Sequence, residues 1–399
     1  MPLTVKWDEG VCVEYGGTKL VFDPQRNDRS VSDVFITHAH FDHAQGFSLK
    51  EPQKVSTEET GKIVTAYGKE VNNWKPLPLG GRVKVDDIEV VSHNAGHVLG
   101  SALYEVITPE GNVVYTGDLQ FKDSFTMKAA EPVSCDILIM ESTFGSPSFS
   151  FPDREEVAQE MVEWALKTIK NRKVPAFKAD SLGNAQEVTK AFNMNSKLPV
   201  VVHWRIAQFN NIYKAYGENL KFFDARSEEA SEITSSGECI FIAPKNLDLT
   251  GHSELEPALV SGWALWARKD ENAFALSDHA DFNQLIEFAR ACRPRVVLTC
   301  FGGRFNAILA NQVEKHLGVE ARPLDLVPTS FVLQTENPKV TACIKEILKI
   351  LRMPGFGYSK KWIMEEMKSS GFSDHEIEEA LDRLTRRGLL RTSKDSLQK

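Results

Sequence analysis

The sequence predicts a mixed fold: a β-rich α+β domain, an α/β domain and a small C-terminal helical domain. Three observations predict it. Short apolar runs separated by turn residues fill the first 140 or so residues. Helices and strands alternate from Pro152 onwards, which is typical of a mostly parallel sheet. Three helical segments then lie between Val340 and Arg387, and the 399 residues suffice for two or three such domains.

The β-rich part contains apolar runs of strand length. Pro109-Glu110-Gly111-Asn112 is a turn signal, and it predicts a hairpin between two of these runs. We expect strands at residues 11–15, 20–22, 34–37, 88–92, 103–108, 113–116 and 137–140.

The alternating part begins with an amphipathic helix over residues 153–170, where Val157, Met161, Trp164, Ala165 and Ile169 share one face. Proline and acidic residues stand at its start, where a helix N-terminus favours them. Strands are expected at 174–177, 199–202 and 239–242, with helices at 183–193 and 207–216 between them. A strand, a helix and a strand follow at 274–276, 282–291 and 296–299.

Composition predicts a cytoplasmic protein that does not enter membranes. No apolar run approaches the roughly 20 residues that span a bilayer, and the N-terminus MPLTVKWDEG lacks the features of a signal peptide. Six cysteines without CxxC spacing favour a reducing compartment over a disulfide framework. The net charge of −8 is uneven, since residues 339–399 carry 13 Lys and Arg against 9 Asp and Glu.

The segment from Thr37 to His43 gathers three histidines and an aspartate immediately after an expected strand. At a strand end, His38 and His40 can point toward one ion, and Asp42 and His43 toward a neighbouring one. Imidazole and carboxylate are ligands that zinc prefers, and imidazole also suits iron or nickel. The alternative is a solvated histidine-rich turn, which this spacing disfavours.

Further candidate ligands lie at later strand ends. His97, in Gly96-His97-Val98-Leu99-Gly100-Ser101, supplies a third histidine for the first ion, and Asp118 can bridge two ions. Asp23 can orient a ligand histidine from outside the ligand shell, although an aspartate before proline is also a common turn starter.

His38-Ala39-His40-Phe41-Asp42-His43, with His97 and Asp118, resembles the metallo-β-lactamase superfamily. Glu141-Ser142-Thr143-Phe144-Gly145 and Ser277-Asp278-His279-Ala280-Asp281 are similar to two signatures of its β-CASP nuclease branch. Residues 95–102, Ser261-Gly262-Trp263 and residues 276–281 resemble ligase-associated DNA exonucleases in particular, and Cys300, in place of the histidine that RNA-processing members keep, resembles the Artemis-like DNA-repair branch. The resemblance implies an αββα metallo-β-lactamase sandwich in residues 1–143 and 273–335, and a β-CASP cap in residues 144–272.

The resemblance also implies a zinc-dependent phosphodiesterase. Its first zinc would be held by His38, His40, His97 and Asp118, and the second by Asp42, His43 and Asp118, with Mn²⁺ or Mg²⁺ able to substitute. Asp42, Asp118, Glu141 and His279 would be catalytic, with Glu141 holding His279 as general acid. The implied substrate is nucleic acid, DNA before RNA, cleaved by an exonuclease of DNA repair. An RNA 3′-end-processing nuclease of the same branch and a lactonase- or thioesterase-type hydrolase are the alternatives.

Two positions depart from the family pattern. Cys300 stands at or beside the histidine that completes the second metal site, so it is either a thiolate ligand or the mark of a weak second site, which we favour. Asn184 stands where related enzymes usually carry Lys or Arg. Ser181 and Gly183, at a helix start, therefore have two interpretations: a contact with a phosphate or an ordinary helix cap.

Two further features are interpreted from the sequence. The Trp263 and Trp266 pair is assigned to packing rather than to base stacking. Residues 338–399 resemble a winged helix with a basic end, which favours phosphate contacts with DNA, although acidic residues on its third helix also suit a protein partner. This basic end comprises Arg383, Arg386, Arg387, Arg391 and Lys394.

Overall fold

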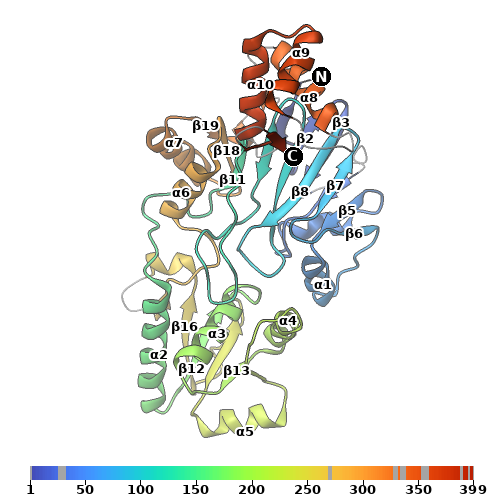
Figure 1. The fold of residues 1–399 in the computed structure, drawn as a ribbon. Helices are drawn as coiled ribbons and strands as arrows, with labels where there is room; N and C mark the ends of the chain where they lie inside the picture. Colours follow the sequence, from blue (N-terminus) through green and yellow to red (C-terminus); the bar gives the residue numbers. More distant parts are fainter. Residues whose placement is uncertain are drawn as a thin grey trace.

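The computed structural model describes residues 2–25, 33–267, 272–326, 331–332, 338–351, 359–386, 390–393 and 396–398. Within them, two seven-stranded sheets form one layered body, a six-stranded sheet forms a second, and a short hairpin ends the chain. Figure 1 shows the second body below the first, with the C-terminal helices at the opposite end. The expected mixed fold is thereby confirmed.

The first sheet has the order β20-β1-β2-β3-β4-β5-β6. Neighbours are antiparallel as far as β3 and parallel from β3 to β6. Its strands are β1 (Thr4–Trp7), β2 (Val11–Tyr15), β3 (Thr18–Phe22), β4 (Asp33–Phe35), β5 (Gln53–Ser56), β6 (Trp74–Pro76) and β20 (Phe331–Val332).

The second sheet has the order β19-β18-β11-β10-β9-β8-β7. The expected hairpin is present, since β9 and β10 pair antiparallel across the 108–111 turn. From β10 to β19 the neighbours are parallel. Its strands are β7 (Arg82–Val85), β8 (Ile88–Asn94), β9 (Ala102–Ile107), β10 (Asn112–Tyr115), β11 (Ile137–Glu141), β18 (Val296–Cys300) and β19 (Glu320–Pro323).

These two sheets bury a common core because side chains alternate between the faces of a strand. In β11, Ile137 and Ile139 join Phe22 and Phe35 of the first sheet in that core, whereas Leu138 faces the opposite side. Helices α6 (Phe282–Cys292) and α7 (Phe305–Leu317) cover this outer face, and α1 (Glu58–Ala66) covers the first sheet. The result is the αββα arrangement (Figure 1).

The inserted body, which we call the cap, is a parallel sheet of order β14-β13-β15-β12-β16-β17. Its last strand, β17, pairs with β16. Residues 273–274 therefore belong to the cap sheet, whereas the family resemblance places residues from 273 in the first domain. The strands are β12 (Val174–Ala179), β13 (Val200–Val202), β14 (Phe223–Asp224), β15 (Ile240–Pro244), β16 (Leu255–Val260) and β17 (Ala273–Phe274). The helices are α2 (Arg154–Lys170), α3 (Asn184–Asn195), α4 (Trp204–Ala215) and α5 (Glu228–Ser236).

Some helices were not expected from the sequence, among them α1 in the β-rich half and α7 after β18. For α1 a signal was present: Thr57 caps the helix through its side chain, and Glu58 and Glu59 stand in the first turn. The interior Gly61 weakens the helical pattern, and it is required because the Trp74 ring lies directly against it.

The C-terminal part has its own buried apolar cluster, formed by α8 (Pro338–Leu351), α9 (Lys360–Ser369) and α10 (Asp374–Arg386). The hairpin of β21 (Arg391–Ser393) and β22 (Ser396–Gln398) follows. The winged helix itself stays a prediction. Arg383 pairs with Glu379 of its own helix, and the expected basic residues Arg387 and Lys394 lie outside the described residues. In the described parts, no helix combines the length and apolarity needed to cross a bilayer.

Candidate metal centre and active-site pocket

Four loops that follow strands meet at one edge of the sandwich. The 37–43 segment follows β4, His97 follows β8, Asp118 follows β10, and Glu141 ends β11. Gly117 allows two of these loops to touch, because a Cβ there would lie 2.6 Å from Thr37 Oγ1 and its φ of +54° is left-handed. The sheets therefore bring together side chains that are more than 80 residues apart.

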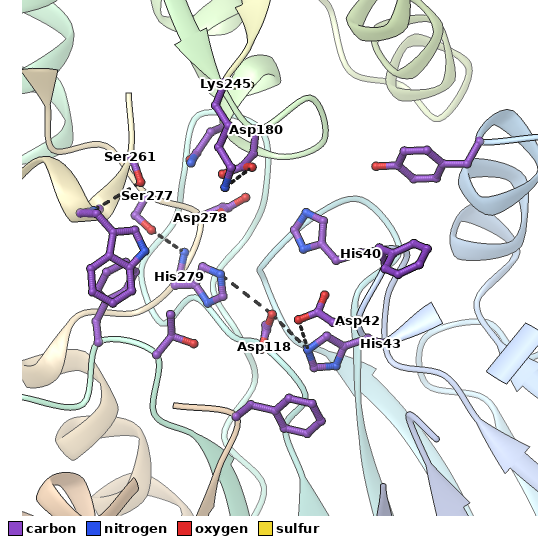
Figure 2. Close-up of a pocket in the computed structure, with 18 residues that line it drawn as sticks. His40, Asp42, His43, Asp118, Asp180, Lys245, Ser261, Ser277, Asp278 and His279 are labelled. Atoms are coloured by element: carbon purple, nitrogen blue, oxygen red, sulfur yellow. Dashed lines mark hydrogen bonds and ion pairs between the residues drawn. The ribbon is translucent and has the colours of Figure 1, made fainter. Parts of the chain in front are cut away.

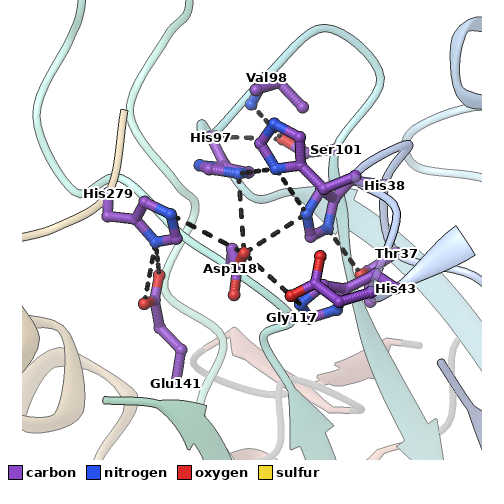
Figure 3. Close-up of polar contacts among 12 residues, drawn as sticks. Thr37, His38, His43, His97, Val98, Ser101, Gly117, Asp118, Glu141 and His279 are labelled. Carbon is purple, nitrogen blue, oxygen red and sulfur yellow. Dashed lines mark hydrogen bonds and ion pairs between the residues drawn. The ribbon is translucent and has the colours of Figure 1, made fainter. Parts of the chain in front are cut away.

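The first group consists of His38, His40, His97 and Asp118. Figure 3 labels three of them, His38, His97 and Asp118, which point toward one another. His40 Nδ1 lies 3.1 Å from His38 Nε2 and 3.0 Å from His97 Nε2. Asp118 Oδ2 lies 3.4 Å from His38 Nε2 and 3.7 Å from His97 Nε2. A tetrahedral site with metal–ligand distances of about 2.0–2.1 Å separates its ligand atoms by about 3.4 Å, so these spacings fit one ion.

The outer nitrogens of the three rings fix their protonation. His97 Nδ1 donates to the Asp278 carbonyl at 2.9 Å, and His40 Nε2 donates to the Leu182 carbonyl at 3.3 Å. The Thr37 hydroxyl donates to Asp23, so it accepts from His38 Nδ1 at 3.0 Å. All three inner nitrogens consequently present lone pairs toward each other and toward the Asp118 carboxylate. Such a set is repulsive without a cation, and the donors therefore fit a divalent metal.

Burial supports the same protonation. It is the main cause that lowers the pKa of His38 to about 4, and it lowers the pKa of His97 well below its usual value. Both imidazoles are therefore neutral at pH 7, which is the form that binds a metal.

The second group is Asp42, His43 and Asp118. His43 Nε2 lies 3.5 Å from Asp118 Oδ2 and 3.7 Å from Asp42 Oδ2. On its other side, His43 Nδ1 lies 2.7 Å from Asp23, which is fully buried and also accepts from the Tyr115 hydroxyl at 2.9 Å. Asp23 thus holds the orientation of His43, and Asp118 lies between the two groups.

Cys300 does not face these groups. Its thiol contacts the Met140 carbonyl at 3.5 Å in the sandwich core, and burial, with the charges of Asp118 and Glu141, raises its pKa well above the usual value. The next residue, Phe301, has a left-handed φ of +56° and stacks on His43, with ring centroids 4.5 Å apart. The sequence reasoning missed Phe301, although its place between a strand end and Gly302-Gly303 was a signal.

The fully buried Glu141 pairs with the partly buried His279 beside the first group. The two Glu141 oxygens lie 3.0 and 3.1 Å from His279 Nδ1, and His279 Nε2 lies 3.9 Å from Asp118 Oδ2 (Figure 3). Burial lowers the pKa of His279, but the charges of Glu141 and Asp118 outweigh it and raise this pKa well above its usual value. A protonated imidazole therefore faces the cluster.

A cavity of about 420 Å³ opens over both groups, between the sandwich and the cap. Figure 2 shows Asp180 and Lys245 at its cap side, paired at 2.7 Å. Ser181 and Gly183 are not among the lining residues, and the Gly183 amide donates to the Gln186 side chain at 2.7 Å. The sequence reasoning assigned no role to Asp278, whose buried carboxyl lies against Gly183 and has its pKa raised to about 6 by burial.

The sequence of this chain is similar to those of several known proteins. Residues 15–176 match the model of the beta-lactamase superfamily domain. The chain is 28% identical to a probable DNA ligase of Opitutus terrae, over 76% of this chain and 29% of that protein. It is 23% identical to the RNase aCSPSF2 of Saccharolobus solfataricus, over 57% of this chain and 48% of that protein. It thus spans less than half the length of either relative.

A solved structure supports the fold. A protein of unknown function from Enterococcus faecalis superposes with a TM-score of 0.57 and 16% identity, covering 84% of this chain and all of that chain. At that identity the likeness concerns the fold alone.

Proposed function

For this member of the β-CASP branch of the metallo-β-lactamase superfamily, we propose a metal-dependent nuclease that hydrolyses phosphodiester bonds of nucleic acid. One observation carries the proposal: the four-residue group around His38 lies beside the Glu141–His279 pair, at the base of an open cavity. Lone pairs that hold a cation and a group that gives a proton are the two requirements of phosphodiester hydrolysis.

We propose zinc as the ion, because three imidazoles and one carboxylate are a zinc-like donor set, whereas magnesium favours oxygen ligands. Bound there, a divalent ion supplies activation of water near neutral pH and neutralisation of phosphate charge. His38, His40, His97 and Asp118 would hold it.

The residues of the chain perform the remaining steps. His279 holds a proton at Nε2 and gives it to the departing alkoxide, while Glu141 keeps Nδ1 protonated and stabilises the imidazolium. Asp118 Oδ2, between His43 and His279, positions both rings. The cap closes one side of the cavity and limits access of water to the reacting phosphate.

We propose DNA as the preferred substrate and DNA repair by an exonuclease as the setting. The similarity to a protein named a probable DNA ligase, over three quarters of this chain, supports DNA. The similarity to an archaeal RNase keeps RNA 3′-end processing as the alternative. The six buried free thiols support a cytoplasmic location. The C-terminal helices would contact DNA or a protein partner.

The test uses end-labelled single strands of DNA and RNA with zinc, with chelator, and with the Asp118→Ala variant. We expect metal-dependent shortening of DNA by the native protein, and at least about 10²-fold less by the variant. Asp248→Ala, at an exposed position remote from the pocket lining, is the matched control. Failure to shorten either nucleic acid, with metal-dependent hydrolysis of a lactone or thioester instead, would favour the small-molecule class.

A further inference from the structure

We propose that a stretch of exposed aromatic rings with adjacent cations forms a binding path for an unpaired nucleic-acid strand. The aromatic path comprises Phe41, Trp263 and Trp266, together with the cations Lys69 and Arg304. The proposal rests on the nuclease function above and specifies its substrate: near the scissile bond the strand is single, and its bases stack on these rings.

The first evidence is exposure. Phe41 is 68% exposed, Trp263 41% and Trp266 48%, and both Phe41 and Trp263 line the cavity over the metal groups. The Trp266 ring lies 5.5 Å from that of Trp263 and continues the path away from the cavity. Large apolar side chains that gather in the open at a polar cavity are typical of binding surfaces. The packing role expected for the tryptophans therefore describes only part of each side chain.

The second evidence is the rigid seat of the tryptophans. Trp263 packs on Phe144 at 5.0 Å, and Trp266 packs on Phe149 at 4.5 Å between ring centroids. Both belong to the short helix η2 (Gly262–Trp266), and the Phe144 ring leaves no room for a Cβ at Gly262. The outward ring faces are thus ordered before a ligand arrives, which lowers the entropy lost on binding.

The third evidence is charge. The Arg304 guanidinium lies 5.9 Å from the Trp266 ring centroid, and Lys69 Nζ lies 3.9 Å from that of Phe41. Aromatic rings flanked by cations match a strand whose bases stack and whose phosphates need counter-charge. The cavity itself is rich in carboxylates, among them Asp42, so the flanking cations supply attraction that its base does not.

The path leads to the reacting centre. The Phe144 ring that supports Trp263 also lies 5.8 Å from the His279 ring. A base stacked on Trp263 would therefore hold its own phosphate near the proton donor. In a duplex the base faces are covered by neighbouring pairs, so a paired strand cannot use this path.

The binding test measures fluorescence anisotropy of a labelled phosphorothioate single strand, which resists cleavage, with the zinc-loaded protein. We expect Trp263→Leu and Trp266→Leu each to weaken the affinity about 5- to 100-fold, and Trp263→Phe to stay within about threefold of native. Tyr216→Leu is the matched control, since Tyr216 is also an exposed aromatic residue, at 36%, but follows α4 in the cap, outside the cavity lining. Melting temperatures establish that each variant is folded.

Three outcomes would overturn the proposal: native affinity in a folded Trp263→Leu protein, an equal loss in Tyr216→Leu, or equal affinity of the native protein for a blunt duplex. A cleavage assay adds a check specific to stacking. Trp263→Leu should lower kcat/KM on an ordinary strand but leave it nearly unchanged on a strand with abasic sites at the cleaved end. If the native protein binds through Trp263 but cleaves neither strand, the nuclease proposal fails while the binding path stands.

Discussion

At the scale of single residues, the chemistry follows from which nitrogen of each histidine carries a proton. In the first group the outer hydrogen bonds turn three lone pairs inward, whereas the bond with Glu141 leaves His279 protonated. We therefore propose that the three rings of the first group bind a cation, whereas His279, held at Nδ1 by the Glu141 carboxylate, donates a proton.

A pH dependence follows for Glu141→Gln. The native carboxylate raises the pKa of His279, and the acid form is present below that pKa and lost as the pH rises through it. Removing the charge lowers this pKa, so the basic limb of kcat/KM against pH should move to lower pH, with a loss of about 10²-fold or more at pH 8. Hydrolysis of a p-nitrophenyl phosphodiester, whose leaving group needs no proton, should lose little of its rate in this variant. An unshifted basic limb would contradict the role of His279.

The second metal group gives another prediction at this scale. Because Phe301 rather than a ligand faces His43, we expect purified protein to carry about one tightly held zinc. Phe301→His, at a left-handed φ that histidine tolerates, should raise the zinc content toward two ions per chain by elemental analysis. Phe301→Leu and Cys300→Ala should leave it unchanged. Two tight ions in the native protein that persist in Cys300→Ala would refute the weak second site.

At the scale of elements, the cap and the sandwich hold each other's site residues. The start of α3 rests on Asp278, and the cap's Tyr213 hydroxyl accepts from the Leu99 amide at 3.0 Å in the loop that carries His97. The Phe209 ring of α4 packs on Tyr67 after α1, with centroids 4.7 Å apart. The geometry of the metal group therefore depends on the inserted sheet.

Gly183→Ala tests this contact. Its φ of +91° disfavours any side chain, and a Cβ would overlap the Asp278 carboxyl. We expect a loss of about 2–4 kcal/mol in the free energy of unfolding, combining strain and overpacking, together with reduced cleavage. Gly217→Ala is the matched control, because its φ is +101° and a Cβ would meet nothing within 4 Å. It should lose only about 1 kcal/mol. Equal effects at both positions, measured by urea denaturation, would mean that the contact with Asp278 contributes nothing.

At the scale of the whole molecule, a bound metal would connect the strand-end loops that the two sheets present. Without a cation, the inward lone pairs and the Asp118 charge repel each other in a buried place. Metal binding is therefore expected to stabilise the folded chain as a whole.

Removal of the metal should lower the melting temperature, and free zinc a thousandfold above its Kd should restore about 4 kcal/mol of stability. Differential scanning calorimetry with chelator and with graded zinc measures this. His97→Ala should lose the zinc-dependent part, whereas His93→Ala, whose histidine pairs with Glu105 outside the group, should keep it. A zinc-dependent shift of native size in His97→Ala would contradict the assigned ligand set.

The sequence by itself determined many of the elements and the kinds of site residue. Strands such as β2 (Val11–Tyr15) and helices such as α2 (Arg154–Lys170) follow from apolar periodicity within short windows, and the helix begins where Asp153 caps it. The segment from His38 to His43 is likewise local, because a strand end orients alternate residues without help from the rest of the chain. The metal chemistry was therefore predictable from the donor types.

Only the tertiary structure decided which partners these residues meet. Asp23 contacts His43, and Asp278 packs against the start of α3. Phe301, next to Cys300, stacks on His43, and the two tryptophans remain partly exposed. Each of these facts depends on how sheets and loops pack across tens to hundreds of residues of chain, or on which way one strand-end side chain turns. No short window of sequence encodes such distances, because they are set by the shared core and not by local backbone preference.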